Sequence, residues 1–132
     1  MKSIFLALGL MLSSTTVNAA TVGVEFNIAQ RCEPGNLLKE ENVQARQFQK
    51  YTEITDQAQI ETIIDVITSV KFDQVQGQIY PNVEVKKIGV MEAPSGTLLV
   101  VFADKDNCVW SYYGFSDEDK NIFFNEIAKR GA

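Results

Sequence analysis

Apolar and polar residues alternate along residues 21–29 of the chain. One face of this segment collects Val22, Val24, Phe26 and Ile28. Alternation of this kind is typical of a strand with one buried face. The Pro34-Gly35 pair then interrupts regular structure. The pattern therefore predicts a first strand over residues 21–29 and a turn over residues 31–36.

Two later segments have the apolar spacing of helices. In residues 37–51 the stripe is thin, because only Leu38, Ala45 and Phe48 share a face. Residues 55–70 have a fuller stripe and a capping residue at Thr55 or Asp56. That stripe consists of Ile60, Ile63, Ile64, Ile67 and Val70. Its β-branched residues lower helix propensity, so we expect tertiary packing to stabilise this second helix.

Three strands are predicted in succession, over residues 83–91, 97–103 and 108–114. Short turns between consecutive strands favour an antiparallel meander. The middle segment is apolar without alternation, so we expect both of its faces to be covered. Residues 73–82 alternate only weakly and form either an edge strand that ends at Pro81 or a loop.

A last helix is predicted to begin after Ser116, with Asp119 in the capping-box position. Lys129 and Arg130 suit the negative end of the helix dipole, and Gly131 suits the stop. The whole order of elements predicts an α+β fold. We expect an antiparallel sheet, made of the 83–114 meander and the 21–29 strand, with helices packed on one face.

The first 19 residues have the features of a secretory signal peptide. Lys2 precedes an apolar run over residues 4–12, which is too short to span a bilayer as a helix, and Val17-Asn18-Ala19 gives a cleavage pattern. The alternative is a retained N-terminal anchor. Cleavage after Ala19, or next after Ala20, leaves residues 20–132 as a single domain. The protein is therefore predicted to be periplasmic or secreted, with no membrane span.

Charge and cysteines refine this picture. Cleavage removes one of 12 basic residues and none of the 17 acidic ones, which leaves a net charge of −6. An acidic protein repels phosphate backbones, so nucleic acid is not expected as a partner. Cys32 and Cys108 are expected to form a disulfide in an oxidising compartment, where the bridge contributes about 4 kcal/mol. The alternative is two free thiols.

Residues 106–115 hold the only tryptophan and a cluster of aromatic rings. In a strand, Cys108, Trp110 and Tyr112 share one face, and Val109, Ser111 and Tyr113 share the other. One interpretation is packing, in which the disulfide draws the N-terminal segment over Trp110. The other is a partner-binding surface, since tyrosine and tryptophan are enriched at interface hot spots. Its candidate residues are Trp110, Tyr112, Tyr113, Phe115, Asp104 and Asp106.

Catalytic chemistry is sparse in this sequence. The chain has no histidine, which removes Ser-His-Asp and Cys-His catalysis and histidine-ligated zinc. It shows no glycine-rich phosphate loop. Asp104, Asp106 and Asn107 hint at calcium, but a hairpin turn explains the same residues. We therefore expect no enzyme activity, no cofactor and no metal.

Three hypotheses for function follow. The first is a small exported binding protein that acts by protein–protein contact, as an inhibitor, an immunity protein or an envelope accessory protein does. The second is a carrier for a small lipophilic molecule, with Leu98, Val100 and Phe102 lining an apolar pocket. The third is a hydrolase that uses two carboxylates.

Overall fold

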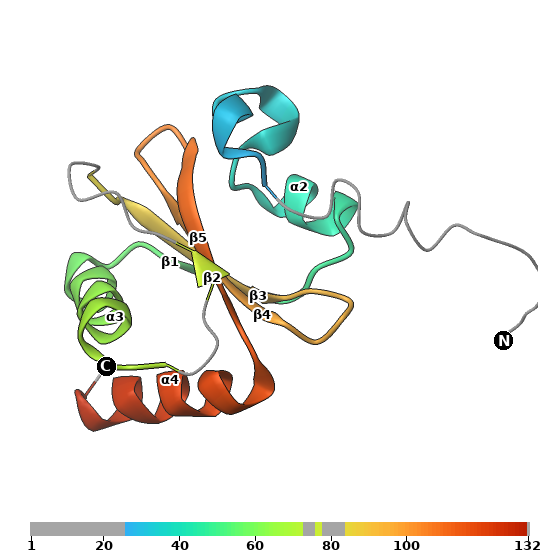
Figure 1. The fold of residues 1–132 in the computed structure, drawn as a ribbon. Helices are drawn as coiled ribbons and strands as arrows, with labels where there is room; N and C mark the ends of the chain where they lie inside the picture. Colours follow the sequence, from blue (N-terminus) through green and yellow to red (C-terminus); the bar gives the residue numbers. More distant parts are fainter. Residues whose placement is uncertain (1–25, 73–75, 78–83, 132) are drawn as a thin grey trace, which may run out of the picture.

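The structure, a computed structural model, describes residues 26–72, 76–77 and 84–131 (Figure 1). Within these residues one antiparallel sheet has the strand order β1-β3-β4-β5-β2. The strands are β1 Gln49–Ile54, β2 Gln76–Gly77, β3 Lys87–Glu92, β4 Leu98–Ala103 and β5 Val109–Phe115. The helices are α2 Glu40–Ala45, α3 Gln57–Ser69 and α4 Asp117–Lys129, with 3-10 turns η1 Ile28–Gln30 and η2 Pro34–Asn36. The predicted α+β fold is confirmed.

The predicted meander is also confirmed, because β3, β4 and β5 are consecutive in the chain and adjacent in the sheet. The central strand β4 is buried along its whole length. This burial follows from its unbroken apolar sequence, which needs cover on both faces. Of residues 73–82, Gln76 and Gly77 pair with β5 and form the edge strand β2; residues 73–75 and 78–82 lie outside the described residues.

Helices α3 and α4 pack together on one face of the sheet (Figure 1). Their side chains join those of the strands in one core, which includes Ile60, Ile63, Val66, Val100, Phe102, Phe115 and Phe123. The opposite face is covered by α2 and the N-terminal segment. The second core includes Phe26, Leu38, Val43, Phe48, Met91, Val101 and Val109. The two long helices therefore lie on the predicted single face, and shorter segments cover the other.

Both long helices begin at the predicted caps. The Asp56 carboxylate accepts a hydrogen bond from the Gln59 N–H at 3.0 Å. The Ser116 hydroxyl accepts one from the Asp119 N–H at 3.3 Å. Gly131, with φ +75°, follows the end of α4 in the left-handed conformation that favours glycine. None of the helices in the described ranges is long and apolar enough to cross a membrane.

The prediction of one helix over residues 37–51 is wrong. Helix α2 covers only Glu40–Ala45, and the chain turns at Gln47, with φ +62°, into strand β1. Ala45 is exposed, whereas Phe48 is buried in the second core. A longer helix would bury little apolar area because its apolar stripe is thin. Residues 49–54 therefore pair with β3 as a strand and do not extend the helix.

The prediction of a strand over residues 21–29 fails for its described part, residues 26–29. The Asn36 side chain holds this segment: its oxygen accepts from the Asn27 N–H at 2.8 Å, and its amide donates to the Asn27 carbonyl at 2.6 Å. It also donates to the Gln30 carbonyl at 3.1 Å. A side chain thus satisfies backbone groups that a neighbouring strand would otherwise bond. Residues 21–25 lie outside the described residues.

Gly89 in β3 lies close beneath the Tyr51 ring. An added Cβ would lie 2.9 Å from Tyr51 Cε1 and 3.0 Å from both Leu38 Cδ1 and Met91 Cε. We expect Gly89→Ala to lower the free energy of unfolding by about 1–3 kcal/mol, the usual cost of overpacking. Urea denaturation followed by Trp110 fluorescence measures this change.

The matched control for Gly89 is Gly35→Ala. A Cβ at Gly35 would meet no heavy atom within 4 Å. This variant should stay within about 0.5 kcal/mol of the parent protein, as open surface substitutions do. Equal free energies of unfolding for the two variants would show that Tyr51 and Leu38 move aside without cost.

Candidate functional site

An apolar groove of about 390 Å³ lies between helices α3 and α4 and the β1–β3 side of the sheet. Its apolar lining includes Ile54, Ile63, Val90, Phe123, Phe124 and Ile127. Phe124 is 47% exposed and is the large hydrophobic residue that the described part of the chain leaves open to solvent. A hollow of this size, with an apolar wall and few polar groups, has the character of a small-molecule site.

Helix α4 presents one continuous stripe to the groove. Phe123, Phe124 and Ile127 line it, and Lys120 precedes Phe123 by three residues and Phe124 by four. Residues spaced three and four apart lie on one helix face, so this face runs from the charged Lys120 in the first turn to the apolar Ile127 near the end of the helix.

The strands show the same gradient. On β1, Lys50, Thr52 and Ile54 all line the groove and run from charged to apolar. On β3, Glu92 and Val90 do so in the opposite chain direction, as antiparallel pairing requires. The groove is therefore charged at one end and apolar at the other.

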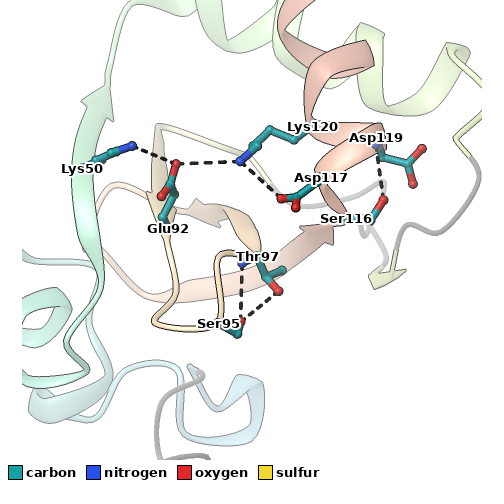
Figure 2. A network of polar contacts seen from close by, with 8 residues as sticks. All are labelled: Lys50, Glu92, Ser95, Thr97, Ser116, Asp117, Asp119 and Lys120. Carbon is teal, nitrogen blue, oxygen red and sulfur yellow. Dashed lines mark hydrogen bonds and ion pairs between the residues drawn. The ribbon is translucent and has the colours of Figure 1, made fainter. Parts of the chain in front are cut away.

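The charged end is a small network of ion pairs (Figure 2). Glu92 Oε2 lies 3.4 Å from Lys50 Nζ and 4.0 Å from Lys120 Nζ. Lys120 Nζ also lies 3.5 Å from Asp117 Oδ1. Long contacts between partly exposed groups contribute only about 0–1 kcal/mol each. These lysines can therefore exchange partners at little cost.

Lys50 has an unusual backbone. Its φ is +58°, in the left-handed region, which costs a residue with a side chain about 1–2 kcal/mol. The register explains it: Gln49 pairs with Glu92 and Thr52 with Val90, so β1 carries one extra residue between these pairs. Such bulges redirect side chains and recur beside functional sites. The backbone at this point sets the position of Lys50 at the charged end.

A second polar cluster lies on the α2 face of the same two strands. The Tyr51 hydroxyl donates to Glu53 Oε2 at 2.8 Å, and Lys87 Nζ lies 3.2 Å from the same oxygen. Burial, and then the bond to Glu53, raises the pKa of Tyr51 well above its usual value. Burial opposes ionisation of Glu53, but Tyr51 and Lys87 together lower its pKa. These shifts favour protonated Tyr51 and ionised Glu53, and the cluster links β1 to β3 through the Glu53–Lys87 ion pair.

The structure pairs Cys32 with Cys108 in a disulfide, as predicted. Beside it the Arg31 guanidinium carbon lies 3.7 Å from the centre of the Trp110 ring. The Trp110 Nε1–H donates to Asp104 Oδ2 at 3.1 Å. The N-terminal segment therefore covers Trp110, which agrees with the packing interpretation.

Asp104 organises the β4–β5 turn. Its Oδ1 accepts from the backbone N–H groups of Asp106 at 2.8 Å and Cys108 at 3.1 Å, in addition to the bond from Trp110. Asp106 is exposed. Among the residues that the structure describes, no three acidic or cysteine side chains gather as a metal site would need. The bonds of Asp104 fit the hairpin-turn interpretation of residues 104–107.

The alternation predicted for β5 is wrong at one point. Ser111 pairs with Phe102, and Val109 pairs with the next residue, Ala103, so Trp110 is the extra residue of a bulge. Val109 consequently packs on the α2 face with Tyr112, whereas Tyr113 and Phe115 pack on the α3–α4 face. Phe115 is 0% exposed, and the two tyrosines are half-buried. Of the six predicted binding residues only Asp106 is exposed, and their role in binding stays a prediction.

Most of the residues around the groove were not identified as site residues from the sequence. The spacing of Lys120, Phe123, Phe124 and Ile127 can be read in the sequence, but every amphipathic helix has such a spacing, so it does not indicate a binding site. Lys50 and Ile54 were hidden because strand β1 was not predicted. Of the three residues expected to line a carrier pocket, Leu98 lines the groove, whereas Val100 and Phe102 lie buried in the core.

Comparison of the chain with protein-family models, with curated proteins and with solved structures found no match in any of the three. The case for function therefore depends on the geometry of the groove.

Proposed function

We propose that this protein is a small non-catalytic binding protein that holds a small, largely apolar molecule in the groove between α3, α4 and the β1–β3 side of the sheet. The observation that supports this proposal is the groove itself, with its volume of about 390 Å³ and its mostly apolar wall. Ligand sites in proteins commonly have volumes of this size and walls that are mostly apolar.

The proposal includes export to the periplasm or the medium. Residues 1–19 have the pattern of a signal peptide, and Cys32 is bonded to Cys108. Disulfides persist in oxidising compartments, so the bridge supports this location.

The chemistry of the groove supports binding without catalysis. The chain has no histidine. The part of the groove wall that the structure describes includes one carboxylate, Glu92. A glycosidase-type mechanism needs two carboxylates flanking the reacting bond.

Titration with the neutral fluorescent probe N-phenyl-1-naphthylamine tests the proposal. We expect saturable binding that Thr52→Trp weakens at least tenfold, because the indole ring would fill the groove. The matched control is Thr55→Trp, an exposed threonine outside the groove wall, which should stay within twofold of the parent protein. Absence of saturable binding, or equal effects of the two variants, would contradict the proposal.

Contact with another protein is the second candidate function, and the position of β1 at the edge of the described sheet favours it. Edge strands can accept an added strand from a partner, and exposed Phe124 lies near. The bulge at Lys50 interrupts the regular backbone of this edge, however, and so hinders the addition of a strand. The groove is therefore the preferred binding site. Affinity capture of the oxidised protein from envelope and secreted fractions separates the two candidates: a stoichiometric protein partner that Thr52→Trp displaces would favour contact.

A further inference from the structure

We propose that the groove selects an anionic amphiphile, with an aliphatic chain along the apolar wall and a single carboxylate head between Lys50 and Lys120. This inference rests on the proposed function and names the class of ligand.

The first argument is the direction of the groove. Three separate elements place their charged residue at the same end, Lys50 from β1, Glu92 from β3 and Lys120 from α4, and Figure 2 shows the three side chains turned toward one another. Their apolar residues continue away from that end. A site with one polar end and one long apolar wall matches a molecule of the same polarity.

The second argument is the length of the ion-pair contacts of Lys50 and Lys120. Two ammonium groups share the single carboxylate of Glu92, at 3.4 and 4.0 Å. Charge-assisted hydrogen bonds between an ammonium and a carboxylate are about 2.7–2.9 Å long, so the Lys50 hydrogen bond at 3.4 Å is long and the Lys120 contact at 4.0 Å is longer still. The side chain of Asp117, the other acid of the network, is 86% exposed and reaches solvent. An added carboxylate head would therefore compete with the solvent-exposed Asp117 for Lys120, and with Glu92 for Lys50, at little cost.

The third argument is the backbone of Lys50, which is independent of the charges. The left-handed conformation and the extra residue in β1 make this position costly for a residue other than glycine. Strained positions persist where the surrounding structure holds them, and they cluster at ligand sites. Here the strained residue is one of the two lysines that would contact the head group.

The volume sets the size of the ligand. At about 30 Å³ per water-sized group in a liquid, a groove of about 390 Å³ holds about a dozen heavy atoms. Decanoate has that size, and 1-decanol and decylammonium match its chain with a neutral and a cationic head.

Calorimetric titration of the oxidised protein tests the proposal, with decanoate and decylammonium below their micellar concentrations and 1-decanol below its solubility limit. We expect decanoate to bind at least tenfold more tightly than 1-decanol, and decylammonium to bind most weakly. Lys50→Gln and Lys120→Gln should each lower the ratio of decanoate affinity to 1-decanol affinity about threefold to tenfold. Lys105→Gln, an exposed lysine in the β4–β5 turn, is the matched control and should change neither.

The ratio of decanoate to 1-decanol affinity is the deciding quantity, because a general loss of folded protein lowers both alike. Equal binding of decanoate and 1-decanol would overturn the selection of an anion and leave the proposed function standing. Tightest binding of decylammonium would overturn it as well, because Glu92 would then contact the head. Failure of all three compounds, together with failure of the neutral naphthylamine probe, would overturn both proposals.

Discussion

Replacing Phe115 with alanine should lower the free energy of unfolding by about 3–5 kcal/mol, the usual range for a buried phenylalanine. Phe115 is 0% exposed at the end of β5. Its ring centre lies 5.0 Å from that of Phe72, edge to face, and 5.1 Å from that of Phe123, stacked. Truncation would therefore leave a cavity between the sheet and α4. Urea or guanidinium denaturation at equilibrium measures the loss.

Phe124→Ala is the matched control for Phe115→Ala. Phe124 is 47% exposed on the neighbouring helix and lines the groove, so its truncation should cost less than about 1 kcal/mol. It should instead weaken binding of an apolar probe. If Phe115→Ala kept the parent free energy of unfolding but no longer bound a partner protein, Phe115 would be a contact residue. That result would contradict the structural role assigned to its buried ring.

The elements predicted correctly are those with a local signal. Helix α4 has its cap at Ser116 and its stop at Gly131 within the same short segment. Helix α3 similarly begins at Asp56 and carries a full apolar stripe. The meander follows from the short turns between apolar segments, because a short turn places consecutive strands side by side in antiparallel orientation. In each case the residues that decide the structure are neighbours in the chain.

The errors arise where distant residues decide. Asn36 bonds the backbone of Asn27 and Gln30, and this removes the need for a strand at residues 26–29. Strand β1 forms by pairing with β3, and the sequence of residues 49–54 alone does not indicate this pairing. The groove was missed for the same reason, since Lys50 and Ile54 line it only once β1 is placed beside β3.

The aromatic segment shows how one residue changes a prediction. Strict alternation puts Val109 and Ser111 on the same face of β5, but the bulge at Trp110 separates them. The Cys32–Cys108 pairing, in contrast, was predictable from the compartment and an even cysteine count. A covered Trp110 was one of two interpretations that the sequence left open, and the Arg31 contact agrees with it. Which residue would do the covering was not predictable, because Arg31 reaches the ring only after the N-terminal segment has folded.

Removal of the disulfide is the second change with a large expected effect. The double variant Cys32→Ser with Cys108→Ser should lower the free energy of unfolding by about 2–5 kcal/mol. The bridge joins residues 76 positions apart, so its loss frees most of the unfolded chain. It also releases the segment that holds Arg31 against Trp110. Guanidinium denaturation followed by Trp110 fluorescence reports both effects in one experiment.

The parent protein under reducing conditions is the control, and it should reproduce the stability of the double variant. The groove provides a further contrast, because it lies on the α3–α4 face of the sheet, whereas the bridge holds the segment on the α2 face. Below the unfolding transition, binding of the neutral naphthylamine probe should therefore stay within about twofold of the parent protein. A loss of binding as large as that of Thr52→Trp would mean that the two faces are coupled through β4 and β5. A loss of stability below about 1 kcal/mol would mean that the Asn36 and Asn42 side-chain bonds hold the N-terminal segment without the bridge.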